Sequence, residues 1–197
     1  QLTKNEIEIL KIWIENGAHF EKLNSIESFL ENEKKAIISL IPSDETIVDP
    51  PRKKDLEALL DLNFRLERNS TSNNYLDAKY LGQLLKSKHI NALVKVKDQL
   101  IKLDLSNSDL DDAQLLKLKS LKNLKYLKIN NTKITDKGLS SINYSVQSLN
   151  LNNSAVTYNG LRKLLDDSSL KAVYLWNTNI NSEHQKELLE NFSVNLN

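Results

Sequence analysis

Leu100-Ile-Lys-Leu-Asp-Leu-Ser-Asn-Ser-Asp-Leu110 is the first of four copies of one eleven-residue pattern. The other copies span 124–134, 146–156 and 170–180, so successive copies begin 24, 22 and 24 residues apart. In every copy the first, fourth, sixth and last positions are aliphatic, the eighth is Asn and the ninth is Ser or Thr. A pattern that recurs every 20–29 residues or so is typical of chains built from stacked structural repeats. These copies therefore decide the fold.

The pattern resembles the leucine-rich repeat consensus L-x-x-L-x-L-x-x-[NST]-x-[IL]. This resemblance implies an α/β leucine-rich repeat solenoid, with parallel strands on the concave face and helices on the convex face. Because strand side chains alternate, the fourth and sixth positions should point inward and the third, fifth and seventh outward on the concave side. The hydroxyls of the ninth position are expected to bond backbone groups of the neighbouring coil; they belong to Ser108, Thr132, Ser154 and Thr178.

The eighth-position asparagines are Asn107, Asn131, Asn153 and Asn177. Asn tolerates the left-handed backbone conformation, which favours a turn role at the exit of each strand. A column of glycan-binding amides is the alternative. After each copy comes a residue that commonly caps a helix, namely Asp111, Thr135, Thr157 and Asn181. Helices are therefore predicted at 112–119, 136–142, 158–165 and 182–191.

The preceding segments are less regular. We predict an N-terminal helical segment at 1–42, a linker at 43–52 that contains Pro50-Pro51, and a repeat domain at 53–197 with irregular first repeats and a C-terminal cap. Within the repeat domain the residue pattern predicts a helix at 55–60, strands at 62–66 and 75–80, a helix at 88–98 and a closing strand at 192–196.

The N-terminal stretch Leu2-Thr-x-x-Glu-Ile-x-x-Leu-x-x-Trp-Ile-x-x-Gly-Ala18 resembles the last helix of planctomycete-type c-type cytochrome domains. In some multidomain bacterial proteins of that family a leucine-rich domain follows the cytochrome, and residues 173–180 resemble its terminal repeat. The resemblance implies an extracytoplasmic location, in the periplasm or at the cell surface. The chain opens at Gln1 and contains no Met, which suggests that it is a fragment of a longer protein. Haem is implied only for a domain upstream of Gln1, and no cofactor is expected in this chain, which has no cysteine.

Composition and motifs reduce the number of functional classes that the sequence supports. The net charge is +1, so nothing global indicates a nucleic-acid partner. No apolar run is long enough to span a bilayer, and no glycine-rich phosphate loop, nucleophile motif or metal-ligand spacing occurs. We therefore expect no enzyme, no catalytic residue and no metal site. Seven lysines lie between Lys117 and Lys137; they indicate either a polyanion site or a solvated convex face.

The concave face remains as the candidate site. Aromatic side chains at outward strand positions, beside asparagines, suit contact with a sugar or a protein. The candidate binding residues are Tyr126, Lys128, Asn130, Asn150, Asn152, Tyr174 and Trp176. The opposing expectation is that segment 192–197 covers Tyr174 and Trp176. The favoured function is a non-enzymatic interaction module that recognises a protein or glycan; the alternative is a structural part of a c-type cytochrome electron-transfer protein.

Overall fold

A computed structural model of the protein describes residues 48–69, 73–143, 145–166 and 169–196. Residues 48–197 form one compact unit. The predicted helical segment 1–42 and most of the predicted linker lie outside the described residues. The described end of that linker is extended and held to the repeat domain, because Asn74 donates to the Val48 carbonyl (2.8 Å) and Gln99 donates to the Asp49 carbonyl (2.8 Å).

The fold is α/β, with a seven-stranded, mostly parallel sheet whose strands follow one another in chain order. The strands are β1 (Phe64–Arg68), β2 (Leu76–Tyr80), β3 (Leu100–Asp104), β4 (Tyr126–Lys128), β5 (Ser148–Asn150), β6 (Ala172–Tyr174) and β7 (Asn195–Leu196). The helices are α4 (Lys53–Asp61), α5 (Ser87–Lys95), α6 (Asp112–Lys117), α7 (Asp136–Leu139), α8 (Tyr158–Asp166) and α9 (Ser182–Asn191), and a 3-10 turn, η1 (Leu118–Ser120), follows α6.

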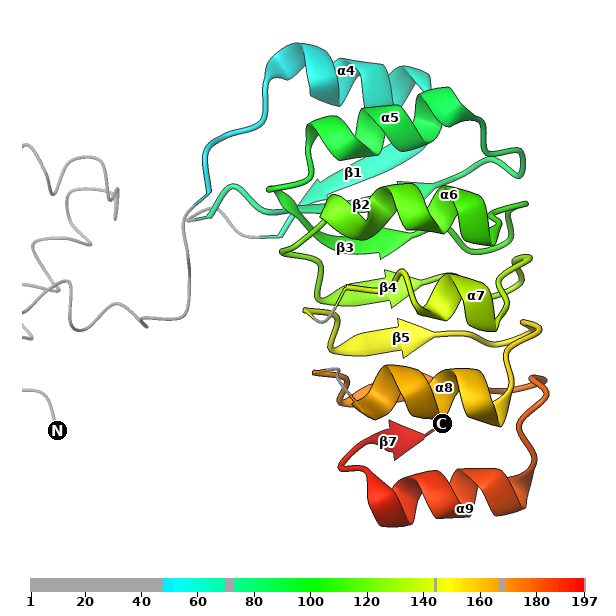
Figure 1. Cartoon of the computed structure of the whole chain (residues 1–197). Helices are drawn as coiled ribbons and strands as arrows, with labels where there is room; N and C mark the ends of the chain where they lie inside the picture. Colours follow the sequence, from blue (N-terminus) through cyan, green and yellow to red (C-terminus); the bar gives the residue numbers. More distant parts are fainter. Residues whose placement is uncertain (1–47, 70–72, 144, 167–168, 197) are drawn as a thin grey trace, which may run out of the picture. The chain divides into compact units, whose positions relative to one another are not determined.

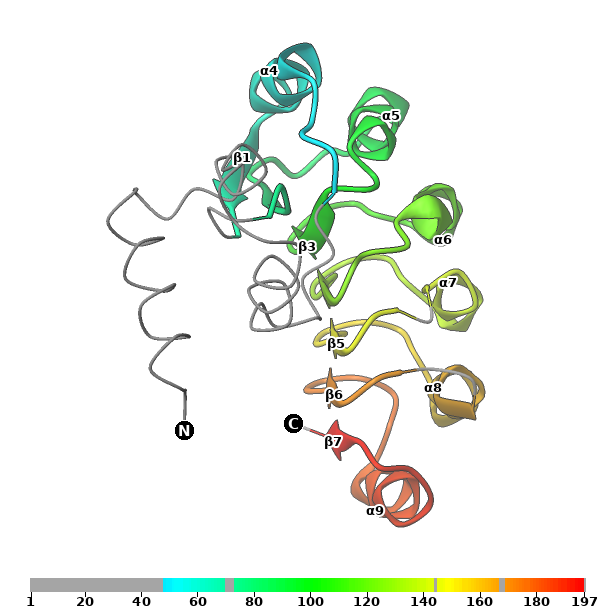
Figure 2. The ribbon, with the colours of Figure 1, turned by 90° about the vertical axis from the view of Figure 1, so that its left-hand side faces the viewer.

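The helices form one layer and the strands another (Figure 1). Figure 2 shows the helices on the outer side of a curved row and the strands on its inner side. This is the leucine-rich-repeat-like arrangement that the four copies predict. The core fills the space between the two layers, where the aliphatic positions of every copy are buried.

The predicted register of the four copies is confirmed. Leu103, Leu127, Leu149 and Val173 are direct partners on adjacent parallel strands, and each is 3% exposed or less. These side chains face the core between the two layers, so each packs against its partners in the coils before and after it, and this packing fixes the register of one coil on the next.

The turn role of the eighth-position asparagines is also confirmed. Asn107, Asn131, Asn153 and Asn177 have φ angles of 54–58°, in the left-handed region. Their side chains link coils in pairs: Asn131 donates to Asn107 Oδ1 at 2.8 Å, and Asn177 donates to Asn153 Oδ1 at 2.7 Å. The backbone conformation and the amide ladder both favour Asn at this position.

The ninth-position prediction is wrong about the partner. Ser108, Thr132 and Thr178 donate to the carbonyl three residues earlier in their own coil, at 2.6–2.8 Å. The left-handed Asn that precedes each hydroxyl turns the chain back, so the hydroxyl comes within reach of the carbonyl of the residue that directly follows the strand, Leu105, Ile129 or Leu175. Ser154 Oγ is buried and has no hydrogen-bond partner among the described residues.

Consecutive coils are also joined through the helix starts. Asp112 accepts from the backbone N–H and hydroxyl of Thr135 (2.9 and 2.6 Å), and Asp136 accepts from the same two groups of Thr157 (2.8 and 2.7 Å). A Cβ on Gly160 would overlap the Asp136 carboxylate, so this glycine leaves room for the carboxylate between coils.

Other departures are local. The helix expected at 136–142 ends at Leu139, and the one expected at 112–119 changes to a 3-10 turn at Leu118. The closing strand is shorter than predicted and pairs with β6 only at Asn195 and Leu196. The strand expected at 62–66 is shifted to 64–68, because Asn63 adopts the left-handed conformation (φ 62°) and still belongs to the turn after α4.

Candidate interaction surface

The side of the sheet that faces away from the helices is called the open face here. Strand pairing aligns its side chains in two rows across the sheet. The first row is Glu67, Asp77, Lys102, Tyr126, Ser148 and Ala172. The second row is Arg65, Lys79, Asp104, Lys128, Asn150 and Tyr174. In each row, every residue that precedes Tyr126 or Asn150 is charged, and every residue that follows is uncharged. We call the part on β1–β4 the charged half, and the part on β5, β6 and the following turn the aromatic half.

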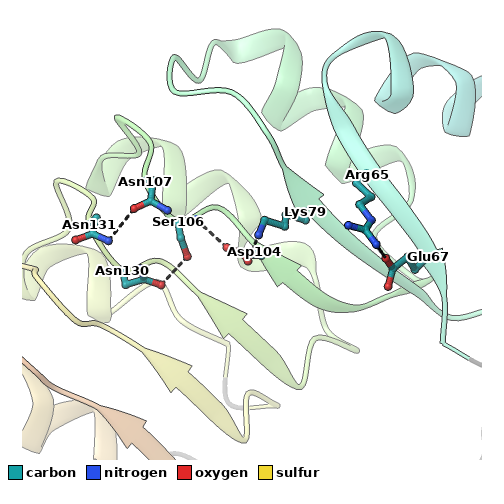
Figure 3. Close-up of polar contacts among 8 residues, drawn as sticks. All are labelled: Arg65, Glu67, Lys79, Asp104, Ser106, Asn107, Asn130 and Asn131. Carbon is teal, nitrogen blue, oxygen red and sulfur yellow. Dashed lines mark hydrogen bonds and ion pairs between the residues drawn. The ribbon is translucent and has the colours of Figure 1, made fainter.

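Ion pairs link most of the charged half. Lys102 lies 3.0 Å from Asp77 and Lys79 lies 3.7 Å from Asp104, each across the β2–β3 pair. Arg65 pairs with Glu67 of its own strand at 2.6 Å. Figure 3 shows the Arg65–Glu67 and Lys79–Asp104 pairs on neighbouring strands. Exposed ion pairs of this kind contribute little stability, typically about 0–1 kcal/mol each.

The charged half is hollowed. A depression of ≈ 210 Å³ lies over β1–β4 and is lined by both rows, with Arg65 and Glu67 on one side and Tyr126 and Lys128 on the other. Lys102 Nζ stands 5.3 Å from the centre of the Tyr126 ring, a cation–π distance. Lys128 is exposed and forms no ion pair within the described residues. It is therefore available to a negatively charged partner group.

The aromatic half exposes two large side chains. Trp176 is 68% exposed and Tyr174 is 37% exposed. The expectation that segment 192–197 covers them is wrong for its described residues, because β7 lies beside β6 as the next strand of the sheet and not across its face. Tyr126, two strands away on the charged half, is 42% exposed. Three aromatic rings are therefore accessible on this side of the sheet.

The three asparagines among the candidate residues, Asn130, Asn150 and Asn152, accept hydrogen bonds that support the turns after the strands. Asn150 Oδ1 accepts from the Asn152 backbone N–H at 3.0 Å, and Asn152 Oδ1 accepts from the Trp176 backbone N–H at 2.8 Å. Asn130 Oδ1 accepts from the Ser106 hydroxyl at 2.6 Å, also visible in Figure 3. These bonds hold the turns that follow the strands. Each side-chain carbonyl oxygen already accepts one bond, so the NH₂ group and the second lone pair of the oxygen are what each side chain offers to a ligand.

All seven predicted residues follow the expected outward positions, but they do not form one cluster. Tyr126 and Lys128 line the hollow, whereas Tyr174 and Trp176 lie two coils further on. Sequence reasoning missed Arg65, Glu67, Asp77 and Lys79. The same outward alternation, applied to the strands expected at 62–66 and 75–80, would have found Asp77 and Lys79, whereas Arg65 and Glu67 also need the pairing of β1 with β2.

The groups with perturbed pKa values lie off the open face. Burial lowers the pKa of His89, whose ring packs 5.2 Å from that of Tyr80. Burial, and to a lesser extent Asp109, raises the pKa of Tyr80. The hydrogen bond to Glu187 is the main cause that raises the pKa of Tyr158, which stacks on His184 between α8 and α9. These contacts belong to helix packing.

Three further observations concern the rest of the described residues. Within the described ranges, no group of three or more His, Cys, Asp or Glu side chains is placed to hold a metal ion. None of the described helices is both long and apolar enough to cross a membrane. Of the seven lysines in the second coil, six are exposed and Lys125 is half-buried.

Comparison with known proteins finds similarity in structure but none in sequence. No protein-family model matches the chain, and no curated protein matches it. Thirty-two chains of solved structures match it in fold. One of them is leiomodin-1 actin-binding site 2, which is 20% identical, with a TM-score of 0.44 over 52% of this chain and 70% of that one. At that score the likeness carries no argument about a ligand.

Proposed function

We propose that residues 53–197 form a leucine-rich repeat solenoid that serves as a non-enzymatic interaction module and recognises a protein or a glycan through its open, concave face. The observation that carries the proposal is the exposure of Tyr126, Tyr174 and Trp176 on one side of a sheet whose other side is core. Exposed Tyr and Trp side chains combine a large apolar area with a polar group and dominate many interfaces.

The rigidity of the face supports the same proposal. The backbone at Trp176 is held by the bond from its main-chain N–H to Asn152 Oδ1, and the backbone at Tyr174 by strand pairing with Asn150. Side chains on a pre-organised backbone lose less entropy on binding than those on a loose loop, so a larger part of their contact energy appears as affinity.

The location is proposed from sequence. The resemblance of residues 2–18 to the last helix of a c-type cytochrome domain is the reason to place the protein outside the cytoplasm, as part of a larger bacterial protein.

The test is a binding screen of the full chain against a glycan array and a displayed peptide library. Trp176→Ala should weaken binding by about 2 kcal/mol or more if the side chain is a hot spot, while thermal melting changes little because the ring is exposed. Leu116→Ala is the matched control, since Leu116 is 57% exposed on the helix side. If Trp176→Ala unfolds the protein, or if ligands bind it as well as wild type, the proposal fails.

A further inference from the structure

The charged half contains an arrangement that costs stability. Across the antiparallel β1–β2 pair, Arg65 lies directly opposite Lys79, and Glu67 lies directly opposite Asp77. Like charges that face each other across two strands are destabilising, and opposite charges are favourable. Exchanging the two residues of β1 would convert both pairs into favourable ones at no cost in composition.

Because of this arrangement, the two rows carry net charges of opposite sign. On β1–β4 the second row carries Arg65, Lys79 and Lys128 against the single acid Asp104. The first row carries Glu67 and Asp77 against the single base Lys102. The two rows are two residues apart along each strand, or about 6.6–6.8 Å. The hollow thus has a positive row and a negative row at a spacing set by the strand.

We infer that this hollow binds an extended protein segment that carries an acidic and a basic side chain two residues apart. The inference rests on the proposed function and names the partner class for the charged half. In an extended segment, residues i and i+2 share one face and are spaced as the two rows are, whereas in a helix they do not face the same side. The acid lies over Arg65 and Lys79, and the base lies over Glu67 and Asp77.

Other ligands fit the hollow less well. A uniformly anionic glycan would meet Glu67, whose side chain is 56% exposed in its pair with Arg65. A drug-sized small molecule needs an enclosed, mostly apolar pocket of about 300–1,000 Å³, and this hollow is smaller, at ≈ 210 Å³, and is lined by charged side chains. A mixed-charge segment satisfies both rows at once.

The test uses labelled nine-residue peptides of Ser and Thr, each with one Glu and one Lys. One peptide places them two residues apart, and its control, of identical composition, places them next to each other, where they point to opposite faces of a strand. Two further controls carry two Glu or two Lys. We expect the spaced peptide to bind the full chain about fivefold more tightly than the others, a modest factor because each exposed ion pair adds little, and to lose this advantage at high salt.

The decisive variant is Arg65→Glu combined with Glu67→Arg. It keeps the net charge and a Glu–Arg pair on β1, but it removes the difference in sign between the rows. Binding of the spaced peptide should fall to the level of the controls. Unchanged binding, equal binding of the adjacent-charge peptide, or no peptide binding at all overturns the inference. A ligand from the screen that depends on Trp176 but not on this exchange would leave the proposed function standing while the inference falls.

Discussion

The charged half and the aromatic half of the open face stand on the same core but differ in how their side chains are satisfied. Lys79, Lys102 and Arg65 already have counter-charges within reach. Tyr174 and Trp176 expose ring surface that no described residue covers. Burial of apolar area supplies most of the free energy of association, and exposed charges mainly set orientation and association rate. On the proposed function, the aromatic half would supply affinity and the charged half selectivity.

The largest expected effect concerns the core that both halves share. Leu127 lies under the open face between Tyr126 and Lys128 and is 3% exposed. Leu127→Ala should lower the free energy of unfolding by about 2–5 kcal/mol, because it opens a cavity between two coils. Lys122→Ala, on an exposed loop, should stay within about 0.5 kcal/mol. Chemical denaturation measures both; equal midpoints for the two variants would contradict the shared core.

A second prediction asks whether the turns of the two halves are equivalent. Asn131 and Asn153 both have φ 54°. Replacing either with Ala should cost about 1–2 kcal/mol, since a Cβ disfavours the left-handed conformation without a local amide bond, and Gly at the same position should cost less. Denaturation of the four variants tests this. If Ala is tolerated in one half only, the halves differ in their backbone as well as in their side chains.

A third prediction concerns the exchange of Arg65 and Glu67 on β1, which should stabilise the protein slightly where the two preceding sets of substitutions destabilise it. Arg65→Glu with Glu67→Arg should raise the free energy of unfolding by about 0.2–1 kcal/mol, because two like-charge pairs become opposite-charge pairs. The gain should shrink in high salt. A variant that loses both binding and stability would mean that the exchange damages the fold, and the two rows would then have no separate role.

The smallest expected effect is a dependence on pH beneath the charged half. His89 is buried and its Nδ1 accepts from the Lys86 N–H at 2.7 Å, which requires the neutral ring. Burial lowers its pKa in the folded state, so the unfolded chain binds the proton first as the pH falls. This contribution is complete above the ordinary histidine pKa of about 6.5 and is lost below it.

The measurement for His89 is the urea midpoint between neutral pH and pH 5. It should fall more steeply in wild type than in His89→Gln, whose amide can still accept at the helix start. Parallel curves for the two proteins would show that His89 does not contribute, and that the acid sensitivity resides elsewhere.

The sequence predicts the regular part of this molecule well because each copy repeats the same physical constraints. The aliphatic positions determine the register of Leu103, Leu127 and Leu149, and the left-handed turn requires Asn or Gly. The ninth-position hydroxyls were assigned to the wrong coil because their bonds depend on a turn geometry that a consensus does not encode.

The candidate site was only partly predictable. Tyr126, Lys128, Tyr174 and Trp176 follow from alternation within the copies, and their exposure agrees with that expectation. The cross-strand pairing of Arg65 with Lys79 could not be predicted, because β1 lies outside the copies and pairs with β2 in the antiparallel direction. A long-range register between irregular segments is set by tertiary packing, which no local pattern specifies.

We propose that the open face, and not the helix side, is the binding surface. Hydroxyl-radical footprinting of the full chain, free and with a ligand from the binding screen, tests it directly. We expect bound ligand to protect Tyr126, Tyr174 and Trp176 from oxidation and to leave Leu116 and Leu189, on the helix side, as reactive as in the free protein. Protection of the two leucines with unchanged reactivity of the three aromatic side chains would contradict it.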